Sequence, residues 1–388
     1  MKIINKRDEE SKKTIWTFAI ASFLNDLGSD IIYPVWPFFV TTILKTNMTA
    51  LGFLDGLGLS LVSISQAASG YLSDRIKKRK VFIWTGYLLG ALSRLGYSFS
   101  TIWPHLIPFK VMDRTGKIRS APRDALVADI STDKNRGKNF GLLRAMDNLG
   151  AVCGILICII FFKLLGYRIL FALAALPSFL SALLIFLLIK EKKTDALKTS
   201  KGISLKDMDK NFRLFLILSS LFALGFFSYS FLLIYAKNFG YKITFIPVLY
   251  LIFTASASLF SLPFGKLSDK IGRKPVLMLS YFFWTTVCLI LILRPNSLMI
   301  ILAFILYGAH KGALEPVQRT FVCELAPLEF RASCLGGFQM ITGLCALPAS
   351  FIAGVLWEGI GTFAPFYLSI ILTVLSGILL VFVKKHRI

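Results

Sequence analysis

A short cationic loop occurs twice in this chain of 388 residues, and its repetition constrains the fold more than any other feature. The first copy, residues 70–80, reads Gly-Tyr-Leu-Ser-Asp-Arg-Ile and continues with Lys and Arg residues. The second copy, residues 265–274, has Gly, Leu-Ser-Asp and a cation at the same places, 195 positions later. A fixed internal displacement is the sequence signature of a duplicated structural unit. We therefore predict that the chain contains two copies of one unit.

The composition indicates a membrane protein. Soluble domains carry roughly a quarter charged residues, whereas this chain has 17% charged and 55% hydrophobic residues, including 35 Phe. Its mean hydropathy is +0.69. A membrane-spanning helix needs about 20 mostly apolar residues. Twelve such helices fit the length and leave short loops, so we predict an all-α membrane protein with twelve transmembrane helices.

The net charge of +23 is distributed in a way that indicates membrane topology and not nucleic-acid binding. The cations gather in segments predicted to lie on one side of the membrane, chiefly residues 1–13, 75–80 and 190–213. This positive-inside asymmetry places both termini in the cytoplasm. The long apolar run after residue 13 contains acids, so we interpret it as a retained first helix. We predict an integral multi-pass protein of a bacterial inner membrane, in contact with lipid bilayer and with no nucleic-acid partner.

The residue types that support catalysis or metal binding are not arranged for either. The six cysteines have no CxxC spacing and fall within or at the edges of predicted spans. The three histidines form no constellation with cysteine or carboxylate, and the sequence contains neither HExxH nor GxSxG. It also lacks a phosphate-binding GxxxxGKS or GxxxxGKT loop. We therefore predict a protein that is not an enzyme and that holds no cofactor or metal.

The repeated loop resembles a motif of a known family. The pattern GxLSD(R/K)I followed by cations is similar to the loop between helices 2 and 3 of the major facilitator superfamily, which recurs between helices 8 and 9. The resemblance implies two pseudo-symmetric six-helix bundles, at residues 1–190 and 212–388, joined by a cytoplasmic linker at 191–211. It also implies that both loops belong to a cytoplasmic gate. The predicted gate residues are Gly70, Asp74, Arg75, Arg79, Gly265, Asp269, Lys270 and Arg273.

Ionisable residues inside the predicted spans indicate a polar cavity. A charge at the bilayer centre costs roughly 2.5–3.5 kcal/mol on insertion scales, so such residues usually face a cavity or each other. Asp26 and Asp30 are four residues apart and share one face of the first helix. In the fourth helix Arg114 shares a sector with other charged residues, whereas Arg123 is expected on the other side. Ion pairing between helices is the structural alternative for any one of these residues.

The two copies carry different charges at equivalent positions of the fourth and tenth helices, which indicates that each half offers different chemistry to a bound molecule. Cations outnumber acids within the spans, so we predict a polar solute that carries negative charge. The helices of the resembled family that line its cavity are 1, 4, 7 and 10. The predicted substrate-binding residues are Asp26, Asp30, Arg114, Lys117, Arg144, Tyr229, Lys311, Glu315 and Arg319.

Carboxyl groups in the cavity are candidates for proton coupling. Burial favours a protonated carboxyl group and a nearby cation favours the ionised form, so protonation and cation contact can alternate. Arg114 lies where the resembled family has an arginine of helix 4 that is often linked to proton transfer. The predicted proton-coupling residues are Asp30, Glu315, Asp26 and Asp147.

These features predict a secondary active transporter that works by alternating access around a midplane site. Its predicted partners are a small-molecule substrate and a proton or another coupling ion. The substrate is expected to be anionic or zwitterionic, such as an organic acid or a polycarboxylate metal chelator of the siderophore type. A proton-coupled multidrug exporter is the alternative within transport. A membrane receptor without transport activity is the alternative outside it.

Overall fold

The computed structural model describes residues 2–76, 78–132, 135–189, 208–293, 295–327 and 330–384. Within these ranges all regular structure is helical and no strand occurs, which confirms the predicted all-α class. Most of the predicted linker at 191–211 lies outside the described residues.

The chain divides into two compact units by its internal contacts. The first unit comprises Met1–Phe39 and Leu61–Thr199, and the second comprises Val40–Ser60 and Ser200–Ile388. The short segment 40–60, which the predicted bundle boundaries place in the first half, is thus grouped with the second unit. The boundaries at residues 190 and 212 stay a prediction.

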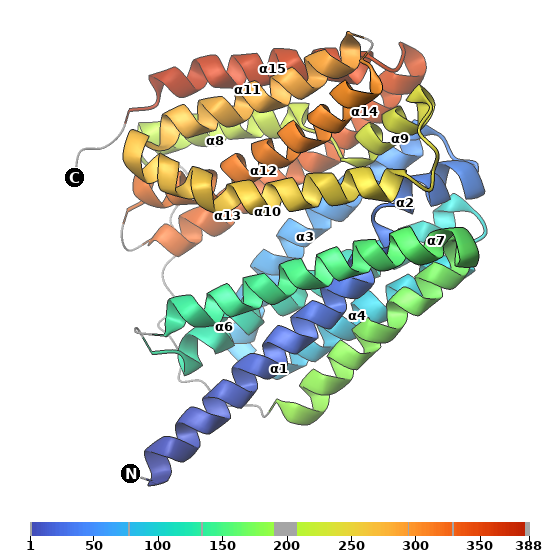
Figure 1. Ribbon diagram of the computed structural model, residues 1–388. Coiled ribbons are helices and arrows are strands. Elements are labelled where there is room, and N and C mark those ends of the chain that lie inside the picture. Colours follow the sequence, from blue (N-terminus) through green and yellow to red (C-terminus); the bar gives the residue numbers. More distant parts are fainter. Residues whose placement is uncertain are drawn as a thin grey trace. The chain divides into compact units, whose positions relative to one another are not determined.

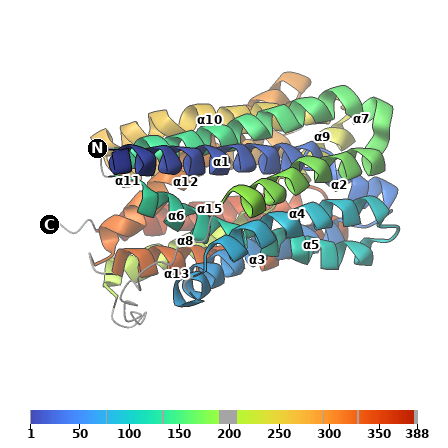
Figure 2. The same ribbon diagram turned by 90° about the horizontal axis from the view of Figure 1, so that it is seen from below.

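In the first unit, α1 packs mainly on α7, and α4 packs on α7 and on α5. Figures 1 and 2 both show α1 running alongside α7. The apolar core of this unit joins α1, α4, α6 and α7 through side chains such as Phe18, Tyr87, Leu126 and Ile185. The helices with residues in this unit are α1 (Lys2–Ile32), α2 (Trp36–Phe38), α3 (Met48–Ile76), α4 (Lys80–Phe99), η2 (Trp103–His105), α5 (Leu106–Thr115), η3 (Gly116–Arg119), α6 (Ser120–Ile130) and α7 (Arg136–Leu188).

Helix α7 contains the fifth and sixth predicted spans. It turns back on itself at Gly166, whose φ of 66° is readily adopted only by glycine. Figure 1 shows both halves extending back from this turn toward the same side, so the chain runs in opposite directions along them. The predicted gap between the two spans, at about residues 163–168, contains this turn.

In the second unit, α12 packs on α10 and α11, and α15 packs on α8 and α11. The seventh predicted span is broken between α8 and α9, and the eleventh is divided near Cys345 between α13 and α14. The helices of this unit are η1 (Phe39–Ile43), the start of α3, α8 (Lys210–Gly225), α9 (Ser230–Phe239), α10 (Ile246–Ile271), α11 (Arg273–Ile292), α12 (Ser297–Leu325), α13 (Arg331–Leu344), α14 (Ala346–Gly359) and α15 (Ala364–Phe382).

Eight helical segments among the described residues are long and apolar enough to cross a membrane. One of them is the whole of α7, which accounts for two of the predicted spans. The predicted first, third and fourth spans, in α1, α4 and α5–α6, are absent from this apolar set of the described chain. These three spans carry Asp26, Asp30, Arg94 and Arg114. The charged residues in these three spans therefore lower the hydropathy of those spans.

The break between α8 and α9 is held by a buried carboxylate. Asp55, in the part of α3 that belongs to the second unit, is 5% exposed. Its Oδ2 accepts a hydrogen bond of 2.7 Å from Ser228 Oγ and another from Ser230 Oγ. The Ser230 backbone N–H donates to Ser228 Oγ at 3.2 Å, so the polar groups at the start of α9 are satisfied. A buried polar group without such partners destabilises a fold by about 1–3 kcal/mol.

We predict that Asp55→Ala lowers the thermal midpoint of the purified protein, because two buried hydroxyls lose their shared acceptor. The expected loss is about 1–3 kcal/mol of unfolding free energy. Asp55→Asn is the matched control, since its amide oxygen still accepts a hydrogen bond. Thermal denaturation in detergent measures both variants. An Asp55→Ala protein as stable as wild type contradicts this role for the carboxylate.

Candidate functional site

Two glycines shape the region where the charged residues of the first unit gather. A Cβ added at Gly86 of α4 would lie 2.5 Å from the carbonyl oxygen of Gly116 in η3, too close for any side chain. The two backbones therefore touch directly. The 3-10 segment η3 advances about 120° per residue instead of 100°, which rotates the following residues. Arg123, in the helix that follows, pairs with Asp124 and Asp147.

A small cavity lies between α1, α4 and α5 within the first unit. Its lining combines cations with aromatic rings, and the cations outnumber the acid by three to one. Low-dielectric surroundings strengthen the attraction of such a lining for negative charge. The lining residues are Ser29, Ile32, Tyr33, Trp36, Arg94, Tyr97, Lys110, Asp113 and Arg114.

Arg94 of α4 enters this cavity from an otherwise apolar helix and is 3% exposed. Its Nη2 donates to Asn25 Oδ1 at 3.2 Å and to Ser29 Oγ at 2.6 Å, which ties α4 to α1. Its Nη1 is buried without a hydrogen-bond partner among the described residues, and the same holds for the hydroxyl of Tyr97. Two polar groups at the cavity are thus left with unused hydrogen-bonding capacity.

The other two cations of the cavity contact its aromatic walls. Arg114 Nη1 donates to the hydroxyl of Tyr33 at 3.2 Å, and Arg114 Nε lies 3.1 Å from the carboxylate of Asp113. The ammonium of Lys110 lies 4.0 Å from the ring centroid of Trp36. Cation–π contacts of this kind stabilise a cation at an aromatic surface.

Asp30 lies beside the cavity and is 8% exposed. Asp26, Lys117, Arg94 and Arg114 lie within electrostatic range of its carboxyl group. The carboxyl group therefore has two alternative ways to be stabilised, by a proton or by the neighbouring cations.

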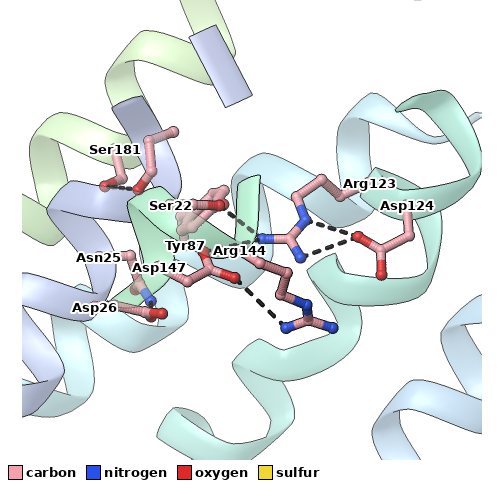
Figure 3. Close-up of polar contacts among 10 residues, drawn as sticks. Ser22, Asn25, Asp26, Tyr87, Arg123, Asp124, Arg144, Asp147 and Ser181 are labelled. Atoms are coloured by element: carbon pink, nitrogen blue, oxygen red, sulfur yellow. Dashed lines mark hydrogen bonds and ion pairs between the residues drawn. The ribbon is translucent and has the colours of Figure 1, made fainter. Parts of the chain in front are cut away.

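Asn25 connects the cavity with a second group of charges. Its Oδ1 accepts from Arg94, while its Nδ2 donates to Asp26 Oδ1 at 2.8 Å. One amide thus bridges a cavity cation and a predicted coupling carboxylate. Figure 3 shows Asn25 and Asp26 next to each other on α1.

The second group centres on Asp147 of α7 (Figure 3). Arg144 lies 3.5 Å from its Oδ2, and Arg123 of α6 lies 3.8 Å from its Oδ1. Arg123 also pairs with Asp124 at 2.9 Å and donates to Ser22 Oγ of α1 at 2.6 Å. The network joins α1, α6 and α7, so the structural alternative of ion pairing accounts for Arg123 and Asp124.

The predicted site residues of the second unit lie on α12 and on the turn before α9. Lys311 Nζ lies 3.5 Å from Glu315 Oε1 and 4.8 Å from the ring centroid of Phe226. The Glu315 side chain is 59% exposed. The Tyr229 ring lies 5.2 Å from that of Tyr250. These residues of the second unit therefore combine one ion pair, between Lys311 and Glu315, with aromatic neighbours.

Arg319, the remaining predicted residue of α12, is exposed, whereas His310 on the same helix is fully buried. The His310 Nδ1 atom lies 2.9 Å from Ser280 Oγ of α11. Its ring stands 5.7 Å from Trp284 and 5.3 Å from Phe226, centroid to centroid. His310 therefore packs in an aromatic interior of the second unit.

The second copy of the repeated loop forms a cluster of ion pairs. Arg273 pairs with Asp269 of the loop and, at 2.8 Å, with Glu324 near the end of α12. It also donates to Ser268 Oγ at 2.7 Å. The loop turns at Gly272, whose φ of 95° favours glycine. Asp269, a predicted gate residue, is therefore in contact with an arginine in this structure.

The first copy makes an equivalent ion pair. Arg79, 3% exposed, pairs with Asp129 near the end of α6. Asp129 and Glu324 are themselves 195 positions apart, the displacement of the repeat. That coincidence in the sequence could have identified both acids as partners of the loops. The side chain of Asp74 lies outside the described part of the chain, so its place in the gate stays a prediction.

Sequence reasoning missed several residues of the cavity itself. Arg94, Lys110 and Tyr97 line it but were not among the predicted site residues. The only sequence signal for Arg94 was its position as a single arginine in an apolar span. Arg114, Lys117 and Asp26 lie within electrostatic range of Asp30. The sequence had placed Asp26 with Asp30 on one helix face and Arg114 with Lys117 on another.

The fold and this site define a multi-pass membrane protein with an internal repeat and buried charges. A sequence model of the Major Facilitator Superfamily matches residues 18–255 and 213–387. An uncharacterized MFS-type transporter of Methanocaldococcus jannaschii is 34% identical over 388 residues, 98% of this chain and 97% of that protein. The chain belongs to the major facilitator superfamily of transporters.

Two further similarities bear on the fold and on function. The multi-drug resistance efflux pump PmrA of Streptococcus pneumoniae is 25% identical over 323 residues, 79% of each chain. A crystal structure of the nucleoside transporter NupG has a TM-score of 0.79 at 16% identity, covering 96% of this chain and 100% of that chain. Together with the helical architecture, these matches confirm the predicted fold of twelve transmembrane helices in two bundles. Small-molecule substrates, alternating access and, for some members, coupling ions are typical of this family.

Proposed function

We propose that this protein is a proton-coupled secondary transporter of a small polar solute that carries negative charge, such as an organic acid or a polycarboxylate chelator. The observation that carries the proposal is the excess of cations in the buried cavity of the first unit. Buried charges in membrane spans face a cavity or a partner. Three cations and one acid give the cavity lining a net positive charge, which favours binding of an anion. We place the protein in a bacterial inner membrane with both termini in the cytoplasm.

Coupling follows from competition for the same cations. Asp30 lies within electrostatic range of Arg94 and Arg114, which are also lining residues of the cavity. A substrate anion and an ionised Asp30 would therefore share two guanidinium groups. Protonation of Asp30 frees these groups for the substrate, so proton and anion bind together and cross the membrane together. Asp26, Asp147 and Glu315 are the other carboxyl groups that we propose for this role.

The two ion-paired loops supply the proposed cytoplasmic gate. Each copy joins an arginine at the start of a helix to an acid 50 or 51 positions further on: Arg79 to Asp129, and Arg273 to Glu324. An ion pair of this kind can form in one transporter conformation and separate in the other, because water can solvate each charged side chain once it is exposed. Gly70, Arg75, Gly265 and Lys270 belong to the same loops.

A multidrug exporter is the second candidate. It draws support from the similarity to the efflux pump of Streptococcus pneumoniae and from aromatic contacts in the second unit. Tyr250 lies 5.7 Å from Phe253, and Phe253 stacks on Tyr307 at 4.3 Å. Aromatic surfaces bind apolar organic cations. The cations of the first unit argue against such a substrate, since like charges repel.

Transport by purified protein in liposomes separates the two candidates. A proton gradient is applied in each direction, inward for symport and outward for antiport, and uptake of labelled citrate, benzoate and the cationic dye ethidium is followed. We expect proton-driven accumulation of an organic anion and none of ethidium. Ethidium movement coupled to the gradient, with no anion moved, would favour the exporter.

Arg114→Ala is expected to weaken binding of the transported anion by about one to two orders of magnitude, since hydrogen bonds to charged groups contribute roughly 1.5–3 kcal/mol. Arg114→Lys should restore affinity in part, because an ammonium lacks the two-pronged geometry. Arg119→Ala is the contrasting variant: its guanidinium donates to Gly116 O at 2.7 Å and stacks on Tyr87 at 4.8 Å, outside the cavity lining. It should lower the thermal midpoint more than affinity. The reverse pattern, measured as dissociation constants, would move the site to the other face.

A further inference from the structure

We propose that Glu358 holds the segment Val40–Ser60 in the second unit in the conformation of this structure, and that the segment leaves this unit in another conformation of the transport cycle. Glu358 lies in the last turn of α14, and the segment includes the start of α3. The proposal rests on the alternating access that is typical of the family and not on the chemistry of the solute. Glu358 is thus a positioning residue, and we call its contact with α3 the latch.

Helix α3 is divided between the two units. Residues up to Ser60 belong to the second unit, and those from Leu61 onward belong to the first. The helix is continuous from Met48 to Ile76. Alternating access moves the two bundles of a transporter as nearly rigid bodies. A continuous helix with one part in each body cannot keep all of its contacts through such a movement, so α3 must either bend or release one set of them.

The carboxylate of Glu358 binds the start of α3. Its Oε1 accepts a hydrogen bond from the Met48 backbone N–H at 2.6 Å, and its Oε2 accepts another from the Thr49 hydroxyl at 2.6 Å. The first N–H groups of a helix lack partners within the helix and favour a negative charge. Helix α3 already has a local cap, because Asn47 Oδ1 accepts from the Ala50 N–H at 2.9 Å. The additional cap supplied by Glu358 therefore ties α3 to α14.

Small residues form the rest of this contact. The two segments run antiparallel, and every fourth residue of α3 meets α14 or the end of α13. At the three glycines involved, an added Cβ would lie only 2.1–2.7 Å from a backbone atom of the other helix. The paired positions are Met48 with Gly354, Gly52 with Ser350, Gly56 with Leu347 and Ser60 with Gly343. Backbones in direct contact interlock few side chains, so this surface can separate once the hydrogen bonds to Glu358 are broken.

The position of the latch suits a reversible contact. Figure 1 shows the end of α14 and the turn between α10 and α11 at opposite ends of the second unit. That turn carries the repeated loop of the proposed cytoplasmic gate, so the latch lies toward the other face of the membrane. Glu358 is exposed. Water can therefore replace the two donors of α3 when the contact opens, which keeps the difference in free energy between the two conformations small.

The test measures the position of the segment in the full-length protein. Spin labels carried by an unnatural amino acid replace Lys45, just before α3, and Ile360, just after α14; both residues are exposed and belong to the second unit. Pulsed electron paramagnetic resonance in detergent then gives the distances between the labels, without any solute. We expect mainly one short distance and a small population at a longer distance. Glu358→Ala should raise the ratio of long to short distances at least about tenfold, because hydrogen bonds to a charged group are lost.

Gly354→Ala tests the same contact by steric means. Its methyl group would lie 2.5 Å from Met48 O, so α3 has to move away, and we expect more of the longer distance here too. Gly337→Ala in α13 is the matched control, because no described atom lies within 4 Å of an added Cβ. Asn47→Ala is the control for capping, since it removes the local cap and leaves Glu358 in place. It should lower the thermal midpoint and leave the distances as in wild type.

A single short distance in both Glu358→Ala and Gly354→Ala overturns the latch and leaves bending of α3 as the alternative. Equal populations of the longer distance in Asn47→Ala and Glu358→Ala overturn the role of Glu358, because fraying of α3 would then explain both. Glu358→Gln should lie between wild type and Glu358→Ala, since its amide keeps one acceptor oxygen. These measurements use no transported solute, so a failure of the proposed anion transport would be seen separately.

Discussion

Asp30→Asn is expected to abolish proton-driven accumulation of the transported anion while exchange of internal for external anion continues. The amide cannot take up or release a proton, so the gradient has no group to act on. It also imitates the protonated carboxyl group, because it leaves Arg94 and Arg114 without a competing negative charge. Substrate affinity in this variant should therefore be high and independent of pH. Wild-type affinity should rise as the pH falls, since protonation releases the same two cations.

Two liposome assays measure this outcome: uptake driven by an imposed pH gradient, and counterflow of labelled anion without a gradient. Asp209→Asn is the matched control. Asp209 caps the start of α8 by accepting from the Asn211 backbone N–H at 2.9 Å, and asparagine caps equally well. Amide variants of Asp26, Asp147 and Glu315 complete the series. If all four amide variants of the proposed carboxyl groups still accumulate the anion, a different group or a different ion drives transport.

Much of the fold could be predicted because the signals for it are local or periodic. Apolar runs of the right length predicted the spans, and the 195-residue displacement predicted the repeat. Breaks inside spans could not be predicted in the same way. The break after Gly225 depends on hydrogen bonds to Asp55, which is 173 positions from Ser228 in the chain. The 3-10 turn η3 packs on Gly86 of another helix, a contact that the local sequence does not reveal.

The candidate site shows the same difference between features with a local sequence signal and features that depend on contacts between distant residues. Asp26 with Asp30, and Arg114 with Lys117, could be grouped because each pair lies on one helix at a helical spacing. Arg94 and Tyr97 belong to a third helix, and their importance depends on which atoms lack partners after folding. Helical periodicity describes one face of one helix. It cannot show which faces of three helices enclose a cavity.

The ion pairs of the two repeated loops link the gate to the stability of each unit. Arg79 is 3% exposed while its partner Asp129 is 42% exposed, so the arginine depends more on the pair than the acid does. Breaking a fully buried ion pair destabilises a protein by about 3–5 kcal/mol. The exposure of Asp129 reduces that value, because water can partly replace it. Asp129→Arg adds repulsion to the loss, since two cations would then face each other.

We therefore expect Asp129→Arg to reduce transport at least about tenfold and to lower the thermal midpoint, with a loss of roughly 1–3 kcal/mol, because a buried arginine loses the carboxylate of its ion pair. The exchanged pair, Arg79→Asp with Asp129→Arg, should recover part of both, because opposite charges again face each other. Coupling between the two positions is measured as the difference between the double variant and the sum of the single variants. The equivalent exchange of Arg273 and Glu324 tests the second copy, where Asp269 remains as an additional partner of Arg273. Additive single effects, with no recovery in the exchanged pair, would show that the two side chains act independently of each other.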